Sequence, residues 1–203
     1  MALGDTYATL AELKDRLNTD KPAHDDELKL ALESASRSIE KHLGGRQFND
    51  AVTASARRYY PLHSRLVFVD DFHELSTLVV KSDTAEDGTY ATTIDASEYQ
   101  AEPLDGIHAG LPGWPFWMIR LVGDELFLNT RRPSVQVTAR WGWSAVPAPV
   151  KEATLALAVE NFKMKFAPFG VAGMTEFGTV RVRENPKIAR MVEDYQIDKV
   201  MVA

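Results

Sequence analysis

The sequence predicts an α+β fold in which helices from both ends of the chain form a bundle that brackets one antiparallel β module. Three observations predict it. Amphipathic helical patterns precede residue 45, short segments rich in β-branched and aromatic residues fill the middle, and helical spacing returns after Pro147. Short amphipathic helices cannot bury their apolar stripes alone, so the terminal helices are expected to meet. The predicted parts are 1–50 (N-terminal helices), 51–145 (β insertion) and 146–203 (central helix, long loop and last helix).

The two N-terminal helices carry clear start and stop signals. Thr9 can cap the first helix, with Glu12 completing a capping box, and this helix is expected to end near Asn18. The second helix is expected to begin at about Asp25 and to end at Gly44–Gly45, because glycine readily adopts the left-handed cap conformation. Its apolar stripe, spaced by three and four, is Leu28, Leu32, Ala35, Ile39 and Leu43.

The middle of the chain, from about Thr53 to Trp143, predicts a small antiparallel barrel or sandwich. Apolar and polar residues alternate through 135–140, the period of a half-buried strand, and Asp87–Gly88 indicates a hairpin. A polar turn is expected after RLVFV. The expected strand segments are ARRYYPL, RLVFVDDF, LSTLVVKS, TYATTIDA, EYQAEP, FWMIRLVG, ELFLNT and SVQVTARWGW.

The helix after Pro147 and Pro149 is apolar around most of its circumference. Prolines are tolerated in the first turn of a helix, and a helix of this kind is buried on most sides. We therefore predict a central helix covered by the N-terminal pair, with a neighbouring subunit as a further candidate cover. The predicted subunit-interface residues are Leu155, Val159, Phe162, Phe166 and Trp114.

Residues 166–184 lack a helical period and contain three glycines, which predicts a long functional loop ending in the short strand VRVR at 180–183. Asn185 and Pro186 then begin a last helix. The side chains expected to face inward from it are Ile188, Met191, Val192 and Tyr195.

The composition narrows the classes of function. The 203 residues include 23 basic and 29 acidic ones, for a net charge of −6, whereas proteins that grip nucleic acid usually have a basic excess. The absence of cysteine removes disulfides, thiolate metal sites and cysteine nucleophiles. No signal peptide and no apolar run of about 20 residues is visible, so we expect assembly in the cytoplasm and no membrane partner.

Motifs for catalysis or metal binding are weak. A hydrolase or metal enzyme is one hypothesis, but the spacing of its candidate ligands matches no closed site and a polar turn is the simpler interpretation. Residues 83–88 lack the alternating ligands of a calcium loop and indicate an acidic hairpin tip. No nucleotide-binding or nucleophile motif is present, so we predict no cofactor and no enzymatic activity. The candidate ligands are Asp70, Asp71, His73 and Glu74.

The aromatic segment GLPGWPFW at 110–117 gives a further hypothesis, a carbohydrate- or receptor-binding β module with Trp114 and Trp117 as its platform. Trp117 leads into a strand and is interpreted as a core residue, whereas Trp114 fits a core and an interface equally well. The prominent arginines are expected to pair with neighbouring subunits more than with DNA phosphates. They are Arg57, Arg58, Arg131, Arg132, Arg140, Arg181 and Arg183.

The order of these features resembles one known family. YATLAELKDRL, DDELKLALESASRSIEKHLGGRQF, RRYYPL, the DDF segment, DGTYATTIDASEYQAEP and VQVTARWGWSAVPAPVKEATLALAVENFK follow one another. Together they resemble the head-to-tail adaptor (head-completion connector) proteins of long-tailed bacteriophages, in the β-insertion type found in phages of actinobacteria. The resemblance runs from about Tyr7 to Tyr195, and the stretch from Trp141 to Ala153 is its most specific part.

The resemblance implies a structural role in the virion neck. Twelve copies would form a ring under the portal and above the next connector, stopper or tail protein, and genomic DNA would pass through its lumen without sequence-specific binding. A C-terminal segment, about Asn185 to Ala203, would dock on the portal. The residues that this implies for portal or tail contact are Phe169, Met174, Phe177, Arg181, Arg183, Ile188, Met191, Tyr195, Val200 and Met201.

Overall fold

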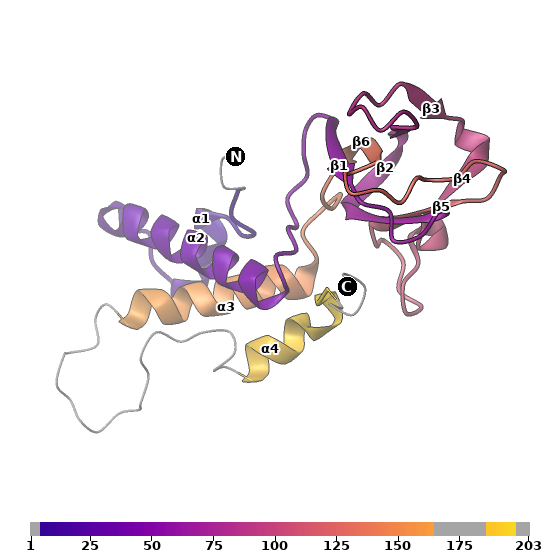
Figure 1. Cartoon of the computed structure of the whole chain (residues 1–203). Helices are drawn as coiled ribbons and strands as arrows, with labels where there is room; N and C mark the ends of the chain where they lie inside the picture. Colours follow the sequence, from indigo (N-terminus) through magenta and orange to yellow (C-terminus); the bar gives the residue numbers. More distant parts are fainter. Residues whose placement is uncertain (1–4, 165–185, 198–203) are drawn as a thin grey trace. The chain divides into compact units, whose positions relative to one another are not determined.

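The computed structural model describes residues 5–164 and 186–197, and the chain divides into two compact units. The helical unit comprises residues 1–48 and 146–203, and the β unit comprises residues 49–145 (Figure 1). The predicted α+β class is confirmed, because helices from both ends of the chain bracket one antiparallel sheet.

Helix α1 (Leu10–Leu17) begins and ends as its caps predict. The Thr9 hydroxyl accepts a hydrogen bond from the Glu12 backbone N–H at 3.2 Å, and the Glu12 carboxylate accepts one from the Thr9 N–H at 2.7 Å. Asn18 closes the helix in the left-handed conformation, with φ of 50°. The capping box therefore fixes the first turn of α1 from both sides.

Helix α2 (Asp25–His42) follows the short 3₁₀ turn η1 (Pro22–His24). Its predicted apolar stripe is fully buried, from Leu28 at one end to Leu43 just beyond the other. The segment before α1 lies against this helix, because Tyr7 donates its backbone N–H to the Ser36 hydroxyl at 3.1 Å and its own hydroxyl to the Glu40 carboxylate. Burial and the neighbouring Glu40 carboxylate raise the pKa of Tyr7 well above its ordinary value.

Helix α3 (Ala148–Met164) is the central helix, as predicted, because it packs against α1, α2 and α4 (Figure 1). Helix α4 (Pro186–Val192) continues into the 3₁₀ turn η5 (Glu193–Tyr195). Ile188 and Val192 are buried, as expected, whereas Met191 and Tyr195 are half-buried. The predictions for the 166–184 loop and for Asn185 lie outside the described residues.

The β unit, all of which the structure describes, forms one six-stranded antiparallel sheet. The strand order is β1-β6-β2-β5-β4, and β3 pairs with the end of β2. The β unit therefore has one sheet and not the two sheets of the predicted sandwich alternative, and β1 and β4 are its edge strands. The strands are β1 (Ser55–Tyr59), β2 (Leu66–Ser82), β3 (Thr92–Ile94), β4 (Tyr99–Glu102), β5 (Phe116–Leu121) and β6 (Val135–Trp141); short 3₁₀ turns lie at Ala96–Glu98 (η2) and Leu104–Gly106 (η3).

Strand β2 differs from the prediction, because it joins two expected strands without a turn between them. Its register shifts between Phe72 and Glu74 and again between Glu74 and Val79, which are β-bulges. These irregularities let residues 66–72 of β2 pair with β5 and residues 80–82 pair with β3. Strand β6 pairs with β2 at Phe72, at Glu74 and at residues 79–82. The predicted polar turn after RLVFV is therefore wrong.

The predicted strand ELFLNT is also wrong, because residues 125–130 have no strand pairing. Phe127 from this segment nevertheless enters the core, and its N–H donates to the Ser64 carbonyl at 2.7 Å. The predicted hairpin is confirmed, since β2 and β3 pair antiparallel through a longer loop over residues 83–91. The Asp83 carboxylate organises this loop by accepting the Gly88 N–H at 2.8 Å.

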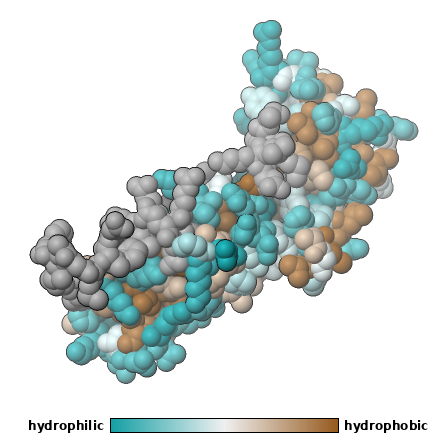
Figure 2. Space-filling view, turned by 90° about the horizontal axis from the view of Figure 1, so that it is seen from below, coloured by the Kyte–Doolittle hydropathy of each residue, from teal (hydrophilic) through white to brown (hydrophobic). Residues whose placement is uncertain are grey.

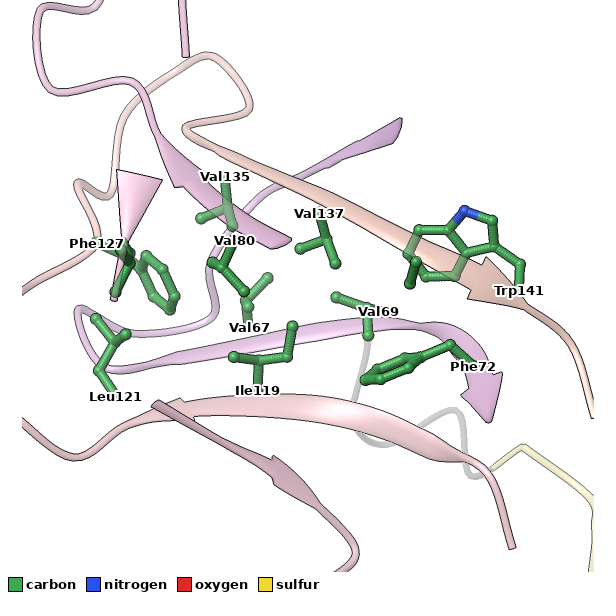
Figure 3. Packing of buried hydrophobic residues seen from close by; sticks show 12 residues of the cluster. Val67, Val69, Phe72, Val80, Ile119, Leu121, Phe127, Val135, Val137 and Trp141 are labelled. Carbon is green, nitrogen blue, oxygen red and sulfur yellow. The ribbon is translucent and has the colours of Figure 1, made fainter. Parts of the chain in front are cut away.

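One hydrophobic core fills the concave side of the sheet (Figure 3). Valines from β2 and β6 meet Ile119 and Leu121 of β5, and the rings of Phe72 and Trp141 lie together at one end with their centroids 6.1 Å apart. At about 25 cal/mol per Å² of apolar surface removed from water, such a cluster is the main term that stabilises the β unit.

Acid should weaken the helical unit through Glu12. The Thr9 N–H, with the Lys151 ammonium, lowers the pKa of the Glu12 carboxyl to about 2. A lowered pKa stabilises the fold above the ordinary value of 4.5, and this stabilisation disappears as pH falls through about 2. Because Glu12 is partly exposed, we expect a loss below about 1 kcal/mol.

Urea titrations followed by circular dichroism between pH 5 and pH 2 would measure this effect. Glu12→Gln should flatten that part of the pH dependence, while Glu33→Gln, on the exposed side of α2, should leave it unchanged. An equal response from both variants would contradict the role given to the capping box.

Candidate subunit-contact surfaces

The predicted ligand cluster at 70–74 is divided among separate partners. Asp70 pairs with the Arg57 guanidinium at 2.6 Å and accepts the Tyr59 hydroxyl at 2.8 Å. Asp71 instead accepts the indole N–H of Trp143 at 2.9 Å. Successive strand residues point to opposite faces, so the two carboxylates cannot converge on one ion. Within 5–164 and 186–197, no group of three or more His, Asp or Glu residues is placed to hold a metal ion.

The rest of this cluster surrounds Arg140. The guanidinium of Arg140 pairs with the Asp50 carboxylate and, at 3.2 Å, with Glu74. These bonds raise the pKa of Arg140, and hydrogen bonds from Ser76 and Arg140 lower the pKa of Glu74. His73 Nε2 lies 3.5 Å from Asp50, and its Nδ1 lies 3.2 Å from the Gly142 carbonyl oxygen.

Arg57 and Arg140 have acidic partners within the β unit, and the pairing of the prominent arginines with neighbouring subunits stays a prediction. Asp70 of β2 lies beside Arg57 of β1, and Asp50 and Glu74 lie beside Arg140 of β6. Arg57 also lies over the Trp141 ring, 4.5 Å from its centroid, and Arg58 lies over Tyr90 at 5.4 Å. Arg131 and Arg132 are exposed, and Arg181 and Arg183 lie outside the described residues.

The first and last segments of the β unit meet at Gly142. The Ala51 N–H donates to the Trp141 carbonyl at 2.8 Å, and the Gly142 N–H donates to the Asp71 carbonyl at 2.6 Å. Gly142 has φ of +99°, and a Cβ added there would lie 1.7 Å from the Asn49 carbonyl oxygen. Glycine is therefore required both by the backbone conformation and by the close approach of the two segments.

Trp114 belongs to an aromatic cluster inside the β unit. Its ring centroid lies 4.7 Å from His108, 6.0 Å from Trp117 and 5.1 Å from Trp143. Only 7% of Trp114 is exposed, which leaves it little surface for a sugar or another subunit. The observation favours the core interpretation of Trp114. The half-buried Trp117 ring lies at 71° to the Trp114 ring, so the two do not form one flat platform.

The predicted subunit-interface residues of α3 differ in exposure. Leu155 is buried in the chain itself, whereas Val159 and Phe162 are half-buried. The Phe162 ring lies 5.7 Å from the His24 ring, so part of it is covered by the N-terminal segment. Phe166 lies outside the described residues.

Most of the predicted portal- or tail-contacting residues lie outside the described residues, namely Phe169, Met174, Phe177, Arg181, Arg183, Val200 and Met201. Ile188 is a core residue of α4. Tyr195 packs on Phe48 with centroids 5.8 Å apart, and its carbonyl accepts the Arg46 guanidinium at 3.0 Å, so it has a structural role. A shallow depression beside α4 is lined by Pro186, Lys187, Arg190 and Met191. No described helix is long and apolar enough to cross a membrane.

Sequence reasoning missed a set of exposed aliphatic residues in the loops of the β unit. Hydrophobic residues at the molecular surface are visible among hydrophilic ones in Figure 2. Their side chains resemble core residues in the sequence, and only turn signals such as Asp105–Gly106 and Ala109–Gly110 could have indicated that they lie in loops. The residues include Val52, Leu104, Ile107, Leu111, Val122 and Leu126.

Comparisons with known proteins find this fold in solved structures. No family model matches the sequence. A search of curated proteins also finds no match. Solved structures do match, among them chains from the neck and the virion of a gene transfer agent particle.

Three structures of a gene transfer agent particle contain similar chains. One, the neck of an empty particle computed with C6 symmetry, has a TM-score of 0.56 and 17% identity over 98% of this chain and 93% of that chain. A second, the neck of the native particle with C12 symmetry, gives 0.52 and 16% over 93% and 88%. A third, the virion of the native particle, gives 0.51 and 19% over 98% and 93%. At these identities the likeness establishes a shared fold.

Substitution of Gly142 should destabilise the β unit more than substitution of a comparable glycine. Gly113 has φ of +86° and nothing within 4 Å of an added Cβ. Alanine at either position incurs the left-handed backbone cost of about 1 kcal/mol. Gly142→Ala must also move the Asn49 backbone, so we expect a further loss of about 2 kcal/mol or more.

The free energy of unfolding, measured from tryptophan fluorescence in urea, would compare Gly142→Ala with Gly113→Ala. Equal losses for the two variants would show that the close approach to Asn49 does not constrain the fold.

Proposed function

We propose that this chain is a structural, non-enzymatic head-to-tail adaptor subunit of a tailed-phage-like particle. Copies of it form a closed ring in the neck, between the portal and the next connector, stopper or tail protein. The observation that carries the proposal is the likeness to chains of a particle neck, which extends over 98% of this chain and so includes both its units.

Ring formation has a physical requirement that the helical unit can meet. In a closed ring, one face of each subunit contacts a different face of the next, so each subunit needs apolar surface beyond its own core. Val159 and Phe162 on α3 keep part of their apolar side chains uncovered. The neck structures of the similar chains were computed with C6 and C12 symmetry, which supports a ring, and a ring of twelve is our preferred number.

The charge distribution supports a passage for DNA. Acidic residues outnumber basic ones by 13 to 8 in the β unit, which therefore holds most of the net negative charge of the chain. A basic lumen would hold DNA phosphates, whereas an acidic one lets the genome slide. We therefore propose that DNA passes through the ring without sequence-specific binding, and that the C-terminal residues from about 185 onward contact the portal.

Electron microscopy of the purified chain, alone and mixed with the portal protein of its particle, tests this function. Negatively stained rings of uniform diameter are the expected result in at least one of the two samples. A chain that stays monomeric by light scattering and ignores the portal would overturn the proposal.

A variant on α3 should weaken the ring without unfolding the subunit. Val159→Ser removes half-buried apolar surface, and we expect the concentration needed for ring formation to rise about tenfold, which corresponds to about 1.4 kcal/mol. Lys163→Ser, at an exposed position on the same helix, is the matched control and should assemble normally.

Light scattering over a dilution series would measure assembly of both variants, with circular dichroism to verify that each is folded. Unchanged assembly by a folded Val159→Ser would remove α3 from the ring contact.

A further inference from the structure

Most cations of the β unit that lack an ion-pair partner gather at one end of its sheet. The unit contains 8 arginines and lysines, of which Arg57, Arg120 and Arg140 form ion pairs within it. The others form no ion pair with any residue that the structure describes. Four of these lie around the start of β6, and together they form the basic patch. They are Arg58, Lys81, Arg131 and Arg132.

Strand pairing places the first two members of the basic patch on the outer face of the sheet. Val135 and Val137 of β6 point into the core, so Gln136 between them points away from it. Arg58 of β1 and Lys81 of β2 lie opposite Gln136 on its two sides. The three side chains therefore form one row on the face that solvent reaches.

Tyr90 connects this row to the other two arginines. Its hydroxyl donates to the Pro133 carbonyl at 2.7 Å, and the Arg58 guanidinium lies over its ring, 5.4 Å from the centroid. Arg131 and Arg132 directly precede Pro133, and both are exposed. The patch thus combines cations from two strands and one loop.

The acidic loop that follows β2 does not neutralise the basic patch by ion pairing. The Asp83 carboxylate accepts the Gly88 N–H at 2.8 Å, and the Asp87 carboxylate accepts the Thr89 N–H at 2.8 Å. Neither of these carboxylates, nor that of the exposed Glu86, forms an ion pair with a described residue. The four cations are therefore available to an external partner.

Four carboxylates without an ion pair to a described residue lie near β4 and β5. The Glu98 carboxylate accepts the Asp124 N–H at 3.1 Å, and Gly123 leaves room for it, since an added Cβ there would overlap this carboxylate. Asp95 caps the turn η2 by accepting the Ser97 N–H at 3.0 Å. Together these carboxylates form the acidic patch, which consists of Asp95, Glu98, Asp124 and Glu125.

One cation lies beside the acidic patch. The Arg65 guanidinium donates to the Gly123 carbonyl and forms no ion pair with a described residue. Four carboxylates against one guanidinium leave this surface with an excess of negative charge. Its sign is therefore opposite to that of the basic patch.

We propose that the basic patch of one copy packs on the acidic patch of the next copy in the ring. The two patches are complementary in charge and lie at opposite ends of the strand order, which runs from β1 to β4. In Figure 1 the β unit has β1 and β6 on one side and β4 and β5 on the other. Two unlike surfaces on one subunit give a head-to-tail contact, which repeats around a ring. The inference rests on the proposed ring and adds a contact through the β unit to it.

The charge of the β unit favours a second copy over DNA as the partner of the basic patch. With 13 acidic and 8 basic residues, the unit as a whole repels phosphates. A contact between opposite charges also weakens with salt, because the Debye length falls from about 10 Å at 0.1 M to about 3 Å at 1 M. Rings should therefore need a higher protein concentration at 1 M salt.

Charge reversal tests the pairing in the full-length chain. The two triple variants are R58E/R131E/R132E on the basic patch and D95R/D124R/E125R on the acidic patch. We expect each of them to raise the concentration needed for ring formation about tenfold or more, because attraction across the contact becomes repulsion. Light scattering over a dilution series would measure assembly, and circular dichroism would verify that each variant is folded.

The combined six-fold variant exchanges the charges of the two patches and keeps the net charge of −6. We expect it to form rings near the wild-type concentration, and an equal mixture of the two triple variants should do the same. The matched control adds three arginines at exposed positions of the helical unit instead. This control should assemble as poorly as the basic-patch triple variant, and it is R58E/R131E/R132E/D15R/D20R/E33R.

The outcomes separate this inference from the proposed function. Rings that both triple variants form as readily as the wild type would overturn the pairing and leave the adaptor role intact. Equal assembly by the six-fold variant and its control would also overturn the pairing, since net charge alone would then decide. Duplex DNA that binds the wild type but not R58E/R131E/R132E, with assembly unchanged, would assign the basic patch to DNA instead. Absence of rings from the wild type, with and without the portal, would overturn both proposals.

Discussion

The structure depends on a close approach between the two ends of the β insertion. When a domain is inserted between two halves of a helical unit, the chain has to enter and leave that domain at neighbouring points. Here the two ends are joined by the Ala51–Trp141 hydrogen bond, by the Arg140–Asp50 ion pair and by the contact of Gly142 with the Asn49 backbone. This junction and the hydrophobic core of the sheet are both formed by residues of the β unit.

Features that depend on local sequence were predicted well, whereas those that depend on strand pairing were not. The capping box of α1 and the stripe of α2 lie within one helix each, so spacing alone reveals them. The bulges in β2 depend on which residues of β5 and β6 lie opposite. Phe127 likewise has the side chain of a strand residue, but it reaches the core from an unpaired segment. No short window of sequence contains that information.

The sequence indicated which types of residue would make contacts, but it did not indicate which residues they would contact. Asp70 was a candidate metal ligand and Arg57 a candidate partner for a neighbouring subunit, yet the two side chains pair with each other at the surface of the sheet. Trp114 was balanced between core and interface, and three aromatic neighbours distant in sequence or separated by a turn decide for the core. The exposed aliphatic residues of the turn between β4 and β5 were missed for the same reason, because exposure depends on the neighbours that a side chain does not have.

An exposed apolar turn, such as the one between β4 and β5, is compatible with a stable subunit only if other interactions hold it in place. Folding gains little from Ile107 or Leu111 themselves, since about half of each stays in water. The position of the turn comes from the buried Trp114 and from Gly106, where a side chain would collide with the Trp114 carbonyl oxygen. The aromatic cluster therefore serves two purposes at once. It contributes buried aromatic surface to the β unit, and it holds in place the turn at Ala109–Gly110, which carries exposed apolar residues.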